Sequence, residues 1–228
     1  MKSKKKILVY LNFITGIIAF LAIILACINY QSDGYSFWYK RLLYFTIQSN
    51  LWIGVMSIVF AILYYLDIKK NKQYITKTLY IIKFACSIAI TITGFIFCSL
   101  LAPFADYNVW TFHNILTHIA TPVCAIACFF MDENQVKFKK NNIFYSLTLP
   151  GGYFLIVIIL QLSKVDFGKG DYFPYFFMDF NSQVGWFGYN FSGLPQLGTF
   201  YWLVIMSLII ISISYVYYII HKKIHNEN

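Results

Sequence analysis

Six apolar segments, each long enough to cross a lipid bilayer, constrain this chain more than any other feature of its sequence. They occupy roughly residues 7–28, 42–66, 78–102, 110–130, 143–162 and 198–220. A helix needs about 20 apolar residues to cross the hydrocarbon layer, whereas barrel strands would alternate over about ten residues. Because 59% of the residues are hydrophobic and only 12% are charged, the surface of a water-soluble domain is excluded. The sequence therefore predicts an all-α polytopic membrane protein, a single six-helix transmembrane domain over residues 1–228 with a long external loop between helices five and six.

Lysine placement predicts how the helices are oriented, because short loops rich in Lys and Arg stay cytoplasmic. Lysines gather before the first span and after the second, fourth and sixth spans, which all lie on one side. We therefore expect a multi-pass protein of the plasma membrane with both termini in the cytoplasm. The net charge of +9 follows from this topology and from attraction to an anionic inner leaflet, so no nucleic-acid partner is required.

The lysine-rich N-terminus also has the appearance of a secretory signal, but its apolar run is too long for a typical one. The string Ile24-Leu25-Ala26-Cys27 loosely resembles a bacterial lipoprotein cleavage site, at which Cys27 would carry a lipid. Cleavage there would leave five spans and an external N-terminus, against the lysine pattern. We expect an uncleaved first helix.

Metal and cofactor signals are weak throughout the chain. All five cysteines fall inside predicted spans, and Cys124 and Cys128 are one turn apart but form no CxxC motif. The strings GxSxG, HExxH and the P-loop are absent. Both intramembrane histidines fall on one helix, whereas a bis-His haem site draws ligands from two. We therefore expect no metal and no other cofactor.

Polar residues interrupt two of the apolar segments at similar depth. They are Thr46, Gln48, Ser49 and Asn50 in the second span, and His113, Asn114 and His118 in the fourth. Measured at 1.5 Å per residue, Thr46 lies roughly 6 Å and His118 roughly 12 Å below the outer ends of their helices. Pro122 cannot donate to the His118 carbonyl, so a kink or a freed acceptor is expected there. Because polar side chains in a bilayer tend to face the protein interior, we expect one pocket that holds a hydroxyl, an imidazole and amide donors.

This set of groups fits a hydrolase, in which a base activates a hydroxyl nucleophile and amide donors stabilise the oxyanion. It also fits a structural role, because Thr can bond back to its own helix and Asn, Gln and Ser join helices. The alternative function is therefore a non-enzymatic small-solute carrier or scaffold, although no internal repeat typical of carriers is visible. Lys83 in the third span is expected to snorkel to the cytoplasmic face, where a lipid headgroup is within reach.

Residues 163–197 form a long external loop that is rich in Gly, Pro and aromatic residues. A connection of this length is more often a lid or a binding loop than a spacer. For the lid, we expect Tyr172, Pro174, Tyr175 and Trp186 to cover the pocket. Aromatic residues also suit the headgroup region, so an interfacial anchor without chemistry is the alternative.

Three blocks of sequence carry a resemblance to a known family. They are Tyr44-Phe45-Thr46-Ile47-Gln48-Ser49-Asn50, then His118 followed by Pro122, then Tyr172-Phe173-Pro174-Tyr175 with Met178-Asp179 and Gly185-Trp186. With these blocks, the number of spans and the loop lengths, essentially the whole chain resembles the androgen-induced gene 1 family. That family includes the androgen-dependent regulator of tissue factor pathway inhibitor and a bacterial branch of six-span proteins.

The resemblance implies an activity, because eukaryotic members are membrane threonine hydrolases that cleave esters between a fatty acid and a hydroxy fatty acid. Carried over to this chain, Thr46 would be the nucleophile and His118 the general base, with His113 as a competing base. Membrane lipids and a lipid ester would be the partners. Beyond what the resemblance implies, we expect Gln48, Ser49 or Asn50 to donate to the oxyanion and Asp106 or Asp179 to orient the imidazole, as the third group of a triad does.

Overall fold

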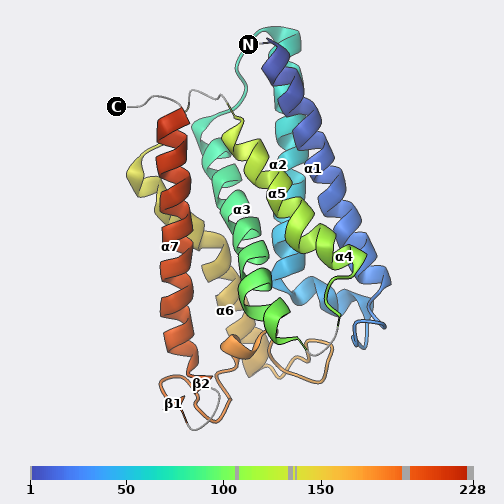
Figure 1. Cartoon of the computed structure of the whole chain (residues 1–228), viewed down its shortest axis with the longest axis vertical. Helices are drawn as coiled ribbons and strands as arrows, with labels where there is room; N and C mark the ends of the chain where they lie inside the picture. Colours follow the sequence, from blue (N-terminus) through green and yellow to red (C-terminus); the bar gives the residue numbers. More distant parts are fainter. Residues whose placement is uncertain (1, 106–107, 133–135, 137, 192–195, 225–228) are drawn as a thin grey trace.

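The computed structural model describes residues 2–105, 108–132, 136, 138–191 and 196–224. Within these residues, six helical stretches are long and apolar enough to cross a membrane, and they pack side by side as a bundle (Figure 1). The prediction of an all-α polytopic membrane protein is confirmed. The α-helices are α1 (Lys2–Ile28), α2 (Phe45–Lys70), α3 (Lys77–Ile96), α4 (Phe112–Ile115), α5 (Thr121–Phe130), α6 (Thr148–Leu162) and α7 (Thr199–Ile224).

Shorter elements complete or connect these helices. The 3-10 helices are η1 (Trp38–Leu43), η3 (Ala102–Phe104), η5 (Lys140–Leu147) and η6 (Phe176–Met178), and the π-helical turns are η2 (Phe97–Leu101) and η4 (Leu116–Ala120). Strands β1 (Tyr189–Asn190) and β2 (Gln196–Leu197) pair antiparallel in the loop that precedes α7. The spans therefore consist of α1, α2, α3 with η2, α4 with η4 and α5, η5 with α6, and α7.

Helix α2 begins at Phe45, later than the expected start near residue 42. Residues Trp38–Leu43 form η1 instead, and Tyr44 is extended with φ −86° and ψ 139°. Thr46 is consequently in the first turn of α2, and the expectation that it lies roughly 6 Å below the start of its helix is wrong. In the first turn of a helix, backbone N–H groups have no partner within the helix, which matters for the site described below.

The centre of the bundle is α3, which is its most deeply buried span. Its residues Tyr80, Phe84 and Ile88 are fully buried against Phe60 of α2 and Phe129 of α5. Helices α1 and α2 have the most extensive contact in the bundle. They pack closely because small residues meet, as transmembrane helices commonly do: a Cβ at Gly54 would lie 3.2 Å from the Cβ of Ala19.

Two π-helical turns interrupt neighbouring spans at the same level of the bundle. In η4, the N–H of Thr121 bonds to the carbonyl of Leu116, five residues earlier. Pro122 follows directly, so the expected irregularity at this proline takes the form of a π-turn. In η2, Phe97 stacks on His118 of η4 with a centroid distance of 3.9 Å and an interplanar angle of 11°. Such turns occur often at functional sites, and here they bring α3 and the fourth span into contact.

The two ends of the bundle differ in charge. One end holds the start of α1, the connection from α2 to α3, the start of η5 and the end of α7 (Figure 1, top). Lysines concentrate in those segments, for example Lys69, Lys70, Lys77, Lys222 and Lys223. We call this the basic end. The opposite end, which we call the loop end, holds η1, the connection after η3 and the long loop between α6 and α7.

Lys83 is completely buried, so the expectation that it snorkels to the membrane surface is wrong. Its Nζ donates to Asn12 Oδ1 at 2.8 Å, lies 4.0 Å from Asp132 Oδ2, and sits 4.1 Å from the ring centroid of Phe60. The side chains of Lys83 and Asp132 are both 0% exposed. A buried lysine in a membrane protein needs such partners, because an isolated charge is costly there.

Candidate active site

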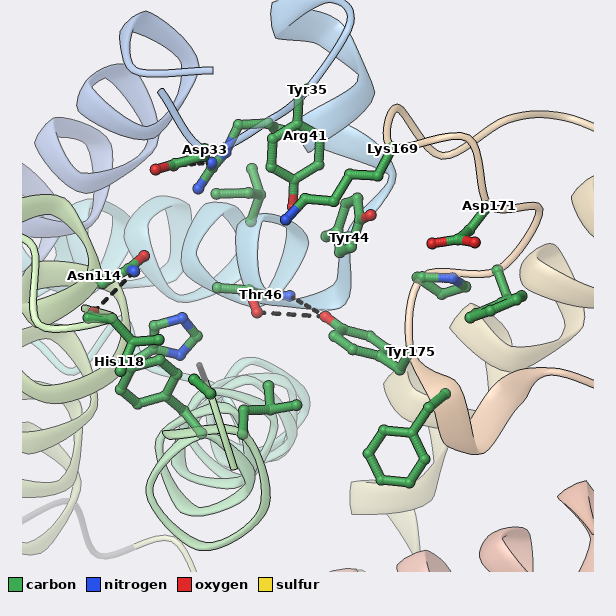
Figure 2. Close-up of a pocket in the computed structure, with 18 residues that line it drawn as sticks. Asp33, Tyr35, Arg41, Tyr44, Thr46, Asn114, His118, Lys169, Asp171 and Tyr175 are labelled. Carbon is green, nitrogen blue, oxygen red and sulfur yellow. Dashed lines mark hydrogen bonds and ion pairs between the residues drawn. The ribbon is translucent and has the colours of Figure 1, made fainter. Parts of the chain in front are cut away.

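A cavity of about 410 Å³ opens at the loop end of the bundle (Figure 2). Five of the candidate catalytic, polar-pocket and lid residues line it: Thr46, Asn114, His118, Pro174 and Tyr175. They come from α2, from the fourth span and from the long loop, so three separate parts of the chain meet here. The cavity therefore brings together the hydroxyl, the imidazole and part of the proposed lid.

Thr46 meets Tyr175 through both its side chain and its backbone. The two hydroxyls are 3.3 Å apart, and the Thr46 N–H donates to the Tyr175 hydroxyl at 3.4 Å. The next two N–H groups of α2, those of Ile47 and Gln48, both donate to the Tyr44 carbonyl. Burial raises the pKa of Tyr175 to about 12, so its hydroxyl keeps its proton at neutral pH. A helix N-terminus carries partial positive charge, and the Thr46 N–H lies in that region.

His118 belongs to η4 and lines the cavity, and it is buried with 7% of its surface exposed. Its ring is held flat against Phe97, and its Nδ1 atom has no hydrogen-bond partner among the described residues. In the view of Figure 2, Thr46 lies between His118 and Tyr175. Within the same part of the chain, no hydrogen bond joins Thr46 to His118; the Thr46 hydroxyl contacts Tyr175 instead.

The polar neighbours of Thr46 on α2 are not among the residues that line this cavity. Ser49 Oγ donates to the Thr46 carbonyl at 3.1 Å and lies 2.7 Å from Thr93 Oγ1 of α3. Asn50 Nδ2 donates to the carbonyls of Thr46 at 2.8 Å and of Thr117 at 3.2 Å. These contacts attach the first turn of α2 to α3 and to η4, so they fix the backbone position of Thr46.

Gln48 has a local role, because its Nε2 donates to the carbonyl of Leu42 at 3.2 Å. This bond connects the first turn of α2 to the end of η1. Gln48 is half-buried and is likewise not among the residues that line the cavity. The structure therefore does not bring the three predicted oxyanion donors to the Thr46 hydroxyl.

His113 belongs to a second cavity of about 590 Å³, which adjoins the first through Asp33, Asn114 and Lys169. Its Nε2 lies 2.9 Å from Asp33 Oδ2, and Thr111 Oγ1 lies 3.3 Å from each ring nitrogen. Asn114 donates to the Val109 carbonyl at 3.0 Å. Thr111, His113 and Asp33 thus form a second set of hydroxyl, imidazole and carboxylate groups, which does not include Thr46.

Asp33 is also ion-paired with Arg41 of η1. Burial raises the pKa of Asp33, but its hydrogen bond with His113 and the positive charge of Arg41 outweigh that effect, so the pKa is lowered overall. The carboxylate therefore stays ionised in the folded protein.

Of the two acids predicted to orient the imidazole, Asp179 can be placed, and no hydrogen bond joins it to His118 within the described residues. Asp106 lies outside the described residues. Asp179 accepts hydrogen bonds from Gln161 Nε2 at 3.2 Å and from the Asn181 N–H at 3.0 Å, and it lines neither of these two cavities. Among the described residues, the carboxylates that line the first cavity are those of Asp33 and Asp171.

The rim of the cavity also holds two cations that the sequence argument missed. Arg41 Cζ and Lys169 Nζ each lie 4.7 Å from the ring centroid of Tyr35, and Figure 2 shows Arg41 next to Asp33 and Lys169 reaching toward Tyr35 from the long loop. Burial and the charge of Arg41 lower the pKa of Lys169. The sequence does contain one signal for a charged rim, because Asp33 and Arg41 are close together in the chain just before the second span.

The long loop covers the cavity only in part. Pro174 and Tyr175 line it, together with the neighbouring aromatic residues Phe173 and Phe176. Tyr172 is exposed, and Trp186 stacks on Phe180 with a centroid distance of 5.1 Å. Neither of these two residues lines the cavity. With Lys169 and Asp171, which also line the cavity, the part of the loop that closes the site lies within residues 169–176.

Comparisons with protein-family models, with curated proteins and with solved structures return no match. Membership of the androgen-induced gene 1 family therefore stays a prediction from the sequence. What the structure contributes is the geometry of one cavity that is lined by a hydroxyl from α2, an imidazole from η4 and a phenol from the loop.

Proposed function

We propose that this chain is an intramembrane hydrolase of lipid esters, with Thr46 as the nucleophile and His118 as the general base. The observation that carries the proposal is the shared cavity: the two residues belong to different spans, and both line it. The resemblance to the androgen-induced gene 1 family supports the same pair of residues. An ester between a fatty acid and a hydroxy fatty acid, or a similar lipid ester, is the proposed substrate.

The chemistry would proceed by acyl transfer. Thr46 Oγ1 attacks the ester carbonyl while His118, whose Nδ1 has no hydrogen-bond partner within the described residues, accepts the hydroxyl proton. The proton then passes from the imidazole to the departing alkoxide, which leaves as the alcohol. Water, deprotonated by the same imidazole, hydrolyses the acyl-threonine ester and restores the Thr46 hydroxyl.

The oxyanion donors in this proposal differ from those expected from the sequence. The Thr46 N–H and the Tyr175 hydroxyl already meet beside the nucleophile, and donors placed where negative charge develops are usually the largest contribution to catalysis. Ser49 and Asn50 act as positioning residues, because they hold the Thr46 backbone.

No carboxylate among the described residues is hydrogen-bonded to His118, in contrast with a Ser-His-Asp triad. The stacked ring of Phe97 fixes the plane of the imidazole instead. Because the ring is held by packing rather than by an acid, the general base in this proposal works as a dyad with Thr46.

The proposed setting is the plasma membrane, with both termini in the cytoplasm and the cavity in the outer leaflet. The lysines of the basic end support this orientation, since such residues stay cytoplasmic. The substrate would then reach the cavity from the outer leaflet, and Phe173, Pro174 and Tyr175 would shield it from water during acyl transfer.

The test is labelling of the detergent-purified protein with a fluorophosphonate probe, followed by peptide mapping of the adduct. Thr46→Ala should abolish labelling, whereas Thr111→Ala is the matched control and should leave labelling intact, because Thr111 contacts His113 rather than His118. Likewise, His118→Gln should slow labelling and His113→Gln should not. An adduct that survives in Thr46→Ala, or that maps to Thr111, would overturn the assignment. A folded wild-type protein that takes no label would favour the non-enzymatic alternative.

A further inference from the structure

Two further cavities continue from Thr46 toward the space between α6 and α7. The first, of about 80 Å³, shares Thr46, Leu101 and Tyr175 with the candidate active-site cavity. The second, of about 190 Å³, shares walls with the first, namely Pro150, Phe177, Met178, Met206 and Ile210. The three cavities therefore adjoin one another in a row that begins at the proposed nucleophile.

The outer cavity of this row is a groove between the two spans that are least buried in the bundle, α6 and α7. Within the described residues, these helices have little contact with each other. Among the described residues that line the groove, the polar side-chain groups are the Ser207 hydroxyl and the Trp202 indole N–H. The groove follows α7 from Trp202 to Ile210, which corresponds to about 12 Å at 1.5 Å per residue.

The surroundings of the groove decide what can occupy it. Apart from Phe177 and Met178 of the long loop, its walls belong to the fifth and sixth membrane-spanning segments, so the medium outside these helices is lipid hydrocarbon rather than water. An apolar, elongated space that opens toward hydrocarbon is complementary to an acyl chain. A polar ligand would find too few partners there, because a site of that kind orients its ligand with several polar groups.

We propose that the groove between α6 and α7 binds one acyl chain of a membrane lipid and guides it to Thr46. This inference rests on the proposed function for its substrate, and it adds the subsite that takes the acyl part of the ester. A chain in the groove has its carbonyl at the inner end, next to Thr46, which is where the nucleophile needs it. The alcohol part then lies in the larger cavity, beneath Arg41 and Lys169.

Three residues of the long loop form the wall between the groove and the proposed nucleophile. Tyr175 stacks on Phe177 with a centroid distance of 5.2 Å, and Phe177 packs against Trp202 of α7. Met178 lines both the groove and the small inner cavity. The ring whose hydroxyl meets Thr46 is therefore part of the same wall that an acyl chain would contact. The wall links occupancy of the groove to the position of Tyr175.

The chain offers a matched pair of variants that test the groove. Gly151 and Gly152 are adjacent in α6, and a Cβ added at either one would meet no atom within 4 Å. Only Gly151 lines the groove. Gly151→Phe therefore places a ring at the groove, while Gly152→Phe makes the same change in composition next to it.

The probe is a long-chain fatty acid with a diazirine near its terminal carbon, added to protein in phosphatidylcholine nanodiscs. Labelling that excess unmodified fatty acid competes away is mapped to peptides of α6 and α7, which separates a site from general contact with lipid. Gly151→Phe should reduce this saturable labelling roughly tenfold, equivalent to about 1.4 kcal/mol of binding free energy. Gly152→Phe should leave it unchanged. Equal saturable labelling in Gly151→Phe, or none in the wild type, would overturn the inference.

The same measurement on Thr46→Ala separates this inference from the proposed function. Acyl-chain binding does not require the nucleophile, so saturable labelling should persist in that variant. Saturable groove labelling in a protein that never reacts with a fluorophosphonate would support the acyl-chain subsite and refute the hydrolase. Fluorophosphonate labelling of Thr46 without saturable groove labelling would support the hydrolase and refute the subsite.

Discussion

Neutralising Asp132 should destabilise the bundle more than any other single charge change described here. Lys83 and Asp132 are fully buried, with Nζ 4.0 Å from Oδ2, and Asn12 gives the ammonium its closest contact at 2.8 Å. Asp132→Asn keeps the shape of the side chain and removes its charge. The ammonium is then left in the interior with an amide and the Phe60 ring as its neighbours.

The magnitude follows from the separation of the two charges. At 4.0 Å and an effective dielectric constant of about 20, the attraction between unit charges is about 4 kcal/mol. Removing one partner of a buried pair typically lowers the free energy of unfolding by about 3–5 kcal/mol, because the other charge stays uncompensated. We expect a loss in this range for Asp132→Asn and for Lys83→Met. The double variant should regain most of that loss, since it buries no charge at this position.

The assay is unfolding in mixed micelles by titration with sodium dodecyl sulfate, followed by tryptophan fluorescence. The four proteins of the cycle give the coupling energy between the two positions directly. Lys72→Met, which changes an exposed lysine at the same end, is the control and should shift stability by no more than about 0.5 kcal/mol. An Asp132→Asn variant as stable as the wild type, or a double variant no more stable than the single ones, would refute the reasoning.

Three other predictions concern the loop end. A Cβ at Gly94 would lie 2.7 Å from the His118 carbonyl oxygen, so Gly94→Ala should lower the free energy of unfolding by about 1–3 kcal/mol. The control is Gly152→Ala, whose added Cβ meets no atom within 4 Å. Equal effects of the two substitutions would contradict the packing argument. Because the pKa of Asp33 is lowered on folding, its stabilising effect should be complete above the unfolded pKa of about 4 and disappear as the pH falls through the lower folded value. The stability difference between wild type and Asp33→Asn should therefore narrow on acidification, and a constant difference would argue against it. Tyr175→Phe should slow fluorophosphonate labelling of Thr46 by about 10²–10³, as for loss of one oxyanion donor, and an unchanged rate would exclude that role.

The spans were predictable because run length alone determines them in a bilayer. The start of α2 was not, since Leu42 and Leu43 at the end of η1 are as apolar as the helix that follows, and only the extended Tyr44 separates the two elements. The burial of Lys83 was also hidden from the sequence. A lysine near the end of a span is normally expected to snorkel to the membrane surface. Its partner Asp132 lies beyond the end of α5, where the sequence gives no sign that the two residues meet.

The candidate site was accessible from the sequence because polar residues near the outer ends of two spans were expected to share one pocket. Thr46 and His118 both line one cavity, although Thr46 lies in the first turn of its span and His118 lies deeper in its own. Lys169 and Asp33 were not accessible in this way, because loops that are far apart in the chain bring them together. The expected role of Gln48, Ser49 and Asn50 as oxyanion donors has another explanation. Polar residues beside a candidate nucleophile can hydrogen-bond to the backbone instead, as these three do to the carbonyls of Leu42 and Thr46.

The paired π-turns also bear on how this bundle can change by insertion or deletion. A π-turn holds one more residue than the α-turn it replaces, so it accommodates that residue within a single turn. In a regular α-helix, losing one residue rotates everything beyond it by about 100° around the helix axis. Losing a single residue from Leu116–Ala120 would instead convert the π-turn to an α-turn, so that His113 and α5 keep their faces. The same loss within α5 would rotate one part of the fourth span against the other, which makes η4 the place where this span tolerates a change of length.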